Sequence, residues 1–191
     1  MELQGQQGRV IEIDRLHPHC GCQEFSISKH SPGALTAGEV LLRIVISPQH
    51  VKKGKPKAAV LSHAETQGLS VFRDNFASDA EILHVATQLV NGARQNQPNP
   101  EKVGVFGVIS MTVGAIRSLV GPNESEPGFC VYDTGKIDIP SHAEAFQRMN
   151  GVPEGVPGQR RTALFTLVQS GFVPVTSFRN GLLSNLAPSV I

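Results

Sequence analysis

The sequence predicts a single α+β domain with a mixed, largely antiparallel sheet, about three helices and an irregular N-terminal arm. Apolar runs typical of strands dominate the first half, and helical patterns fall at intervals without regular β-α-β alternation. The 191 residues include 19 Gly and 13 Pro, which indicates many turns and short elements. We assign residues 1–38 to the arm and residues 39–191 to the domain.

The clearest strand comes directly after the arm. Residues 40–46 (VLLRIVI) are apolar except for Arg43, and such a run is typical of a strand covered on both faces. A lysine-rich loop follows, and residues 58–61 and 69–72 are then predicted as two short strands. Further strands are expected over 103–109, 129–133 and 172–175, with a short one in the arm over 9–13.

Three segments carry helix signals. Ser78 and Glu81 form a capping-box pattern, followed by an apolar stripe at helical spacing and by Gly92 as a stop. Ser141 with Glu144 repeats that pattern and predicts a helix from 142 to about 149. A third helix is expected over about 159–169.

Charge and composition limit the function classes. With 17 basic and 16 acidic residues the formal net charge is +1, which argues against a nucleic-acid binder. The basic run over 52–57 (KKGKPK) is interpreted as a solvated loop, with a phosphate-contacting loop as the alternative. No apolar run is long enough to cross a membrane and no signal core is present, and three cysteines exclude a full disulfide framework. We therefore expect a cytoplasmic protein with reduced thiols.

Four potential metal ligands lie within six residues of the arm: His17, His19, Cys20 and Cys22. Zinc favours such nitrogen and sulfur donors. Structural zinc sites, however, take ligand pairs from two places in the chain, and a second pair is missing. Both a zinc site and an ordinary loop stay open as interpretations.

Arg43 is the first candidate for an anion ligand. A guanidinium in the middle of a strand cannot be buried alone without a large cost. It must reach solvent from an edge strand, pair with a carboxylate, or bind an anion with its two-pronged donor face.

Two histidine-containing segments complete the set of candidate residues. Ser62 and His63 are chemically able to take part in catalysis, but they lie too close in sequence for an orthodox triad, so a surface turn is the competing interpretation. If Ser141 caps a helix, His142 stands at the positive end of its dipole and stays neutral near pH 7, ready to accept a proton. Arg160 and Arg161 can then face the same place as anion ligands.

The order of several motifs resembles a set of small uncharacterised bacterial proteins. The motifs are LLRIV, VLSHAETQGLSVF, PSHA and QRRTAL, and the similarity covers about residues 40–170. This resemblance implies a bacterial, cytoplasmic protein and no particular activity. The order Arg43, Ser62 or Ser70, and Glu144 also resembles ADP-ribosyltransferase-like folds, although an E-x-E strand is missing.

These observations lead to three functional hypotheses. The first is an accessory protein that acts by binding a protein partner, because the sequence has none of the common nucleotide, zincin or hydrolase motifs. The second is an enzyme acting on a nucleotide or NAD-like anion, with Arg43 and Arg160 or Arg161 as anion ligands and His142 as general base. The third is a zinc-stabilised binding module.

Overall fold

The computed structural model describes residues 26–95, 97–149 and 151–189. Its main feature is a six-stranded sheet with the order β6-β7-β4-β1-β5-β8, in which every neighbouring pair is antiparallel. The strands are β1 (Val40–Ser47), β4 (Leu69–Arg73), β5 (Gly104–Thr112), β6 (Phe129–Asp133), β7 (His142–Gln147) and β8 (Phe172–Pro174). The predicted α+β class is confirmed. A second sheet of two strands, β2 (Val51–Lys52) and β3 (Lys55–Pro56), adds a hairpin after β1.

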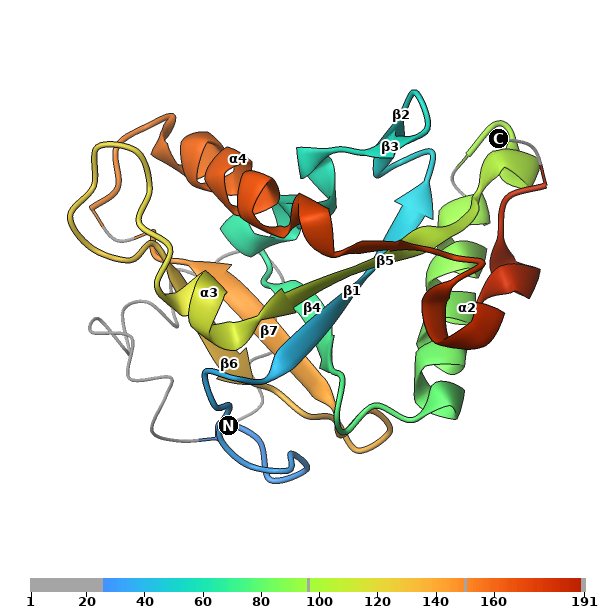
Figure 1. Ribbon diagram of the computed structural model, residues 1–191, viewed down its shortest axis with the longest axis horizontal. Coiled ribbons are helices and arrows are strands. Elements are labelled where there is room, and N and C mark those ends of the chain that lie inside the picture. Colours follow the sequence, from blue (N-terminus) through green and yellow to red (C-terminus); the bar gives the residue numbers. More distant parts are fainter. Residues whose placement is uncertain (1–25, 96, 150, 190–191) are drawn as a thin grey trace.

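Helices and 3-10 turns cover both faces of the large sheet (Figure 1). The α-helices are α2 (Asp79–Gln95), α3 (Val113–Arg117) and α4 (Val156–Val168). The 3-10 turns are η2 (Ala58–Glu65), η3 (Pro100–Lys102), η4 (Gln169–Gly171), η5 (Phe178–Gly181) and η6 (Ser184–Leu186). No helix in the described segments is long and apolar enough to cross a membrane.

Alternate residues of β1 divide the core into two layers, as the apolar run predicted. Leu41 and Val45 pack against side chains of η2, α3 and α4, and we call this side of the sheet the α4 face. Leu42, Ile44 and Ile46 pack against α2 and the C-terminal turns, and we call this side the α2 face. Because successive side chains of a strand point to opposite faces, Arg43 lies on the α4 face with Leu41 and Val45.

The first predicted helix is confirmed at its start. The backbone N–H of Glu81 donates to the side-chain oxygen of Ser78 at 3.2 Å. The carboxylate of Glu81 does not return to Ser78; it accepts from the backbone N–H and the hydroxyl of Ser141 instead. The helix also continues past Gly92 to Gln95, and the Arg94 side chain donates to the carbonyl of Val103 there.

The predicted helix over 142–149 is wrong, since this segment forms β7. Its Ala, Glu and Gln residues favour a helix locally, but β7 lies inside the sheet and pairs with β4 on one side and β6 on the other. All six of its residues are buried. Pairing on both edges outweighs local propensity here.

The predicted strand over 58–61 is also wrong, because these residues belong to η2. Val60, Leu61 and Ala64 point into the core of the α4 face, and α4 packs over this turn. The third predicted helix and the strand at Phe172 are confirmed as α4 and β8, with α4 starting at Val156, ahead of the predicted residue.

The described end of the N-terminal arm, from Ser26 to Glu39, contains no helix or strand, in keeping with the predicted irregular structure. Side chains of Ser26, Ser28 and Ser31 form local turns in this stretch. The strand predicted over 9–13 lies outside the described residues.

Candidate anion-binding site

Arg43 is buried at the centre of the sheet without a carboxylate partner among the described residues. Its side chain is 8% exposed, Nε donates to the carbonyl of Val60 at 3.3 Å, and Nη1 donates to the carbonyl of Ser70 at 2.9 Å. Burial lowers the pKa of Arg43 to about 10, so the guanidinium is still charged at neutral pH. β1 is an inner strand, so the interpretation of Arg43 as an edge-strand residue on a wet face is wrong.

One nitrogen of Arg43 is left for an external ligand. Nη2 donates to no atom of the described residues, yet it is not among the polar atoms that are closed off from solvent. By contrast, several other described arginines each pair with a carboxylate: Arg73, Arg148, Arg160, Arg161 and Arg179. Arg43 therefore combines a buried charge with one donor that no described residue uses.

His50 lies beside Arg43, where the chain leaves β1. Its Nδ1 accepts from the backbone N–H of Ile46 at 3.0 Å, so the neutral ring carries its proton on Nε2. Burial, with the charges of Arg43, His63 and Lys57, lowers the pKa of His50 to about 3. His50 is thus a neutral hydrogen-bond donor across the physiological range.

Ser62 and His63 lie on η2, which packs over the same face of the sheet as Arg43 (Figure 1). The ring of His63 is exposed, and partial desolvation together with the charge of Arg43 lowers its pKa below the ordinary histidine value. Glu65, on the same turn, pairs with Arg161 at 2.7 Å, so its carboxylate is already engaged. The structure therefore brings Arg43 and His63 together, with Ser62 beside them.

The surroundings of this site are strongly cationic. The segment from Val40 to Ala64 contains one arginine and four lysines but no aspartate or glutamate. Among the described residues, no salt bridge joins Arg43 to a carboxylate. An anion is the ligand that such surroundings favour.

Arg160 does not join Arg43. It is buried in a pocket of about 300 Å³ at the loop over 123–127, where Nε and Nη2 donate to the two oxygens of Glu124 at 2.7 and 2.5 Å. Bonding from Arg160 lowers the pKa of Glu124. A second pair, Arg148 with Glu126, lines the same pocket, so its charges are balanced.

His142 lies on the opposite side of the sheet from Arg43. It is paired with Phe72 of β4, whose side chain belongs to the core of the α2 face. Its Nδ1 is 2.8 Å from the hydroxyl of Thr134 and 3.2 Å from the carbonyl oxygen of Thr134. The predicted helix-dipole effect on His142 does not apply, because the residue is in a strand.

The predicted order Arg43, Ser70, Glu144 is present on three adjacent strands, but not on one face. Ser70 of β4 is directly opposite Glu144 of β7, which places both side chains on the α2 face. Arg43 reaches only the backbone carbonyl of Ser70, from the α4 face. A ligand on one face therefore contacts either Arg43 or Glu144.

A second buried arginine escaped sequence reasoning. Arg73, at the end of β4, donates Nε and Nη2 to the two carboxylate oxygens of Glu39 at 2.7 and 2.9 Å, and its Nη1 is 3.4 Å from Asp133. Nη1 also donates to the carbonyl of Gly33 in the arm. The signal was present as charged residues flanking apolar strands, but only the pairing of β1 with β4 shows that they meet.

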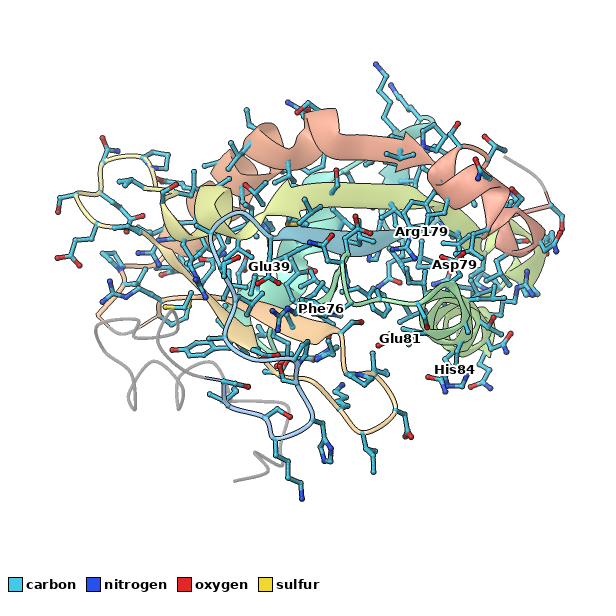
Figure 2. The ribbon with its side chains drawn as sticks, turned by 60° about the horizontal axis from the view of Figure 1, so that its bottom comes forward. Glu39, Phe76, Asp79, Glu81, His84 and Arg179 are labelled. Carbon is cyan, nitrogen blue, oxygen red and sulfur yellow. The ribbon has the colours of Figure 1, made fainter. Side chains whose placement is uncertain are left out.

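The pKa values of the two carboxylates in this network, Glu39 and Asp133, are shifted in opposite directions. Burial alone would raise the pKa of Glu39, but hydrogen bonds from Arg73 and from the Thr36 N–H lower it overall. Burial raises the pKa of Asp133, and the bond from Ser26 with the charge of Arg73 offsets only part of that effect. In Figure 2, Glu39 lies away from helix α2, which carries Asp79, Glu81 and His84, and Phe76 lies between them.

The predicted metal ligands His17, His19, Cys20 and Cys22 lie outside the described residues. Within residues 26–95, 97–149 and 151–189, no group of three or more His, Cys, Asp or Glu side chains is arranged to hold a metal. Cys130 on β6 is buried and disulfide-bonded, which differs from the expected reduced thiols. Its partner is not among the described residues.

Comparison with known proteins adds no assignment. No family model matches the chain, and neither does any curated protein or solved structure. The function of this protein is therefore inferred from the geometry of the site.

Proposed function

We propose that this protein binds a small anionic ligand, such as the phosphoryl group of a nucleotide or NAD-like molecule, through Arg43. The observation that carries the proposal is the buried guanidinium of Arg43, which has one donor, Nη2, that no described residue uses, and no carboxylate partner in the described segments. Bonds to the carbonyls of Val60 and Ser70 fix the guanidinium plane. A fixed donor loses less conformational entropy on binding than a free one.

The neighbouring side chains have distinct roles in this proposal. His50 supplies a neutral N–H donor, and Lys57 supplies a second positive charge. His63 can exchange a proton with the ligand, because its lowered pKa leaves the ring largely neutral at pH 7. Ser62, next to it and partly exposed, is the hydroxyl closest in sequence to this proton acceptor.

Calorimetric titration with inorganic phosphate, ADP and NAD tests the proposal. We expect binding by the wild type, and roughly a tenfold or greater loss of affinity in Arg43→Lys, which keeps the charge but loses the fixed planar donor. His63→Gln, at an exposed position, should weaken binding less. Lys136→Gln, on the distant loop between β6 and β7, is the matched control. Equal affinity in the wild type and Arg43→Lys would contradict the proposal.

Partner binding is the second candidate function, and a groove of about 230 Å³ favours it. β8 pairs only with Gly107, Val108 and Ile109 of β5, so the last part of β5 has no strand partner on that side in the described residues. Ser110, Met111 and Thr112, which form this last part of β5, line the groove together with the exposed side chain of Leu167. An extended peptide can add to such an edge.

The test for partner binding is native mass spectrometry of the protein purified from its own cells. A stoichiometric partner that is lost in Leu167→Lys, but kept in Leu83→Lys on the exposed side of α2, supports this function. Purification without any stoichiometric partner counts against it.

Two expectations from the sequence stay proposals. Zinc binding at His17, His19, Cys20 and Cys22 needs both cysteines as free thiolates, so it competes with a disulfide to Cys130 within this three-cysteine chain. It requires about one zinc per chain in protein purified under reducing conditions without a histidine tag. A bacterial, cytoplasmic location requires Cys130 to be reduced in cells, because disulfides are rare in that compartment. Alkylation of thiols trapped in acid at lysis measures the redox state of Cys130 in cells, and a persistent disulfide would contradict this location.

A further inference from the structure

The hairpin of β2 and β3 extends directly from the Arg43 site. Val51 pairs with Pro56 and Lys52 pairs with Lys55, around a turn in which Lys53 and Gly54 both have positive φ angles of 51° and 70°. The backbone N–H of Lys57 donates to the carbonyl of His50 at 2.9 Å, which continues the pairing by one position. The hairpin is therefore anchored at His50, which lies beside Arg43 in space.

This pairing separates the hairpin into an apolar face and a cationic face. Side chains of directly opposed residues share a face, and those of successive residues alternate. Val51 packs against the core of the α4 face, together with Pro56 on its side. The other face carries a row of lysines from base to tip, first Lys57 and then Lys52 with Lys55, and the neutral, buried ring of His50 lies at its base.

The row of lysines is electrostatically unfavourable for the isolated protein. Like charges directly opposite one another destabilise a strand pair, and Lys52 is opposite Lys55. No carboxylate of the described segments pairs with any of these lysines, and the sequence has none from Val40 to Ala64. A ligand with several negative charges would relieve this repulsion.

The row of hairpin lysines begins at Lys57, which lies beside the proposed anion site. Arg43 Nε donates to the carbonyl of Val60, and the backbone N–H of Val60 donates to the carbonyl of Lys57 at 3.0 Å, so Lys57 lies one turn of η2 from the guanidinium. Lys57 is thus shared by the Arg43 site and the hairpin row. A chain of anionic groups held at one end by Arg43 can continue along Lys57, Lys55 and Lys52.

We infer that the ligand carries a chain of phosphoryl groups, as in pyrophosphate, tripolyphosphate or a nucleoside triphosphate, and that the hairpin lysines bind the groups beyond the first. This inference rests on the proposed anion site at Arg43. It assigns the first phosphoryl group to Arg43 and His50. The remaining groups interact with Lys57, Lys55 and Lys52 as solvated ion pairs.

The test compares orthophosphate with tripolyphosphate, by calorimetry on the full chain at equal ionic strength. We expect tripolyphosphate to bind at least about tenfold tighter, with a steeper loss of affinity as salt is added. The double variant Lys52→Gln, Lys55→Gln should lose roughly tenfold in affinity for tripolyphosphate and leave orthophosphate affinity unchanged. The matched control is the double variant Lys102→Gln, Lys136→Gln, with two lysines away from the hairpin.

The outcomes separate this inference from the function on which it rests. Orthophosphate binding that depends on Arg43, with no gain for tripolyphosphate, overturns the inference and leaves the proposed function intact. The absence of binding for every anion overturns the proposed function. Tighter binding of a single-stranded oligothymidylate than of tripolyphosphate, lost in the hairpin variant, overturns the small-ligand inference in favour of nucleic acid.

Discussion

Two buried arginines on neighbouring strands of the same sheet have opposite environments. Arg73 is 2% exposed, with two carboxylates and a carbonyl around its guanidinium. Arg43 is 8% exposed and contacts two backbone carbonyls and no described carboxylate. The first arrangement is complete within the protein, whereas the second leaves one donor for the anion that we propose. Burial of an arginine is therefore a weak sign of function until its partners are known.

The largest expected effect of a substitution is at Arg73. Arg73→Met leaves the carboxylates of Glu39 and Asp133 buried and unpaired, and breaking a buried pair in this way costs about 3–5 kcal/mol. Urea denaturation at pH 7 measures this loss as a lower free energy of unfolding. Anion affinity at Arg43 should not change in variant protein that is still folded. A loss below about 1 kcal/mol would mean that the network contributes little to stability.

Acid titration distinguishes the two regions through His50 and Glu39. The pKa of His50 is about 3 when folded and about 6.5 when unfolded, so the unfolded chain binds its proton first. The stability due to His50 is complete above pH 6.5 and is lost as the pH falls toward 3. The pKa of Glu39 is lowered from 4.5, so its contribution is lost only below that pH. Asp133 has the opposite sign, because its raised pKa makes acid relieve part of its burial cost.

The variant His50→Asn isolates the histidine term, because its amide oxygen can still accept from the Ile46 N–H. We expect the wild type to lose a few kcal/mol more than this variant between pH 6.5 and pH 4, as measured by urea unfolding at each pH. Parallel losses in the two proteins would show that His50 is protonated at its ordinary pKa in the folded state.

Arg43 itself should matter more for ligand-linked stability than for intrinsic stability. Arg43→Met leaves the carbonyls of Val60 and Ser70 without a donor, which costs about 1–3 kcal/mol. Phosphate at a hundred times its dissociation constant should stabilise the wild type by about 2.7 kcal/mol and leave the variant unaffected. Thermal unfolding with and without phosphate measures both values, with sulfate-free buffer as the reference. An equal gain in both proteins would place the anion elsewhere.

Local sequence patterns were sufficient for elements whose register did not matter. The apolar runs of β1 and β6, and the Ser78 cap of α2, carry their strand and helix signals within a few adjacent residues. The prediction for β7 failed because its residues have the propensity and the cap pattern of a helix. Its strand conformation depends on pairing with β4 and β6, and the residues of β4 are distant in sequence. The prediction that Arg43 and His142 share one site failed for the same reason. That Arg43 and His142 lie on opposite faces follows from strand pairing, which no local pattern contains.

The smallest predicted effect tests how complete the Arg73 environment is. The guanidinium carbon of Arg73 lies 4.6 Å from the ring centre of Phe76, a residue that is 49% exposed. Phe76→Leu keeps an apolar cover but removes the cation–π contact, which is worth about 0.5–1 kcal/mol at an exposed site. Urea unfolding in the Arg73 and the Arg73→Met backgrounds gives this coupling as a double-mutant cycle. A coupling near zero would mean that Phe76 only covers the ion pairs of Arg73. The different environments of Arg73 and Arg43 would then be due to Glu39 and Asp133 alone.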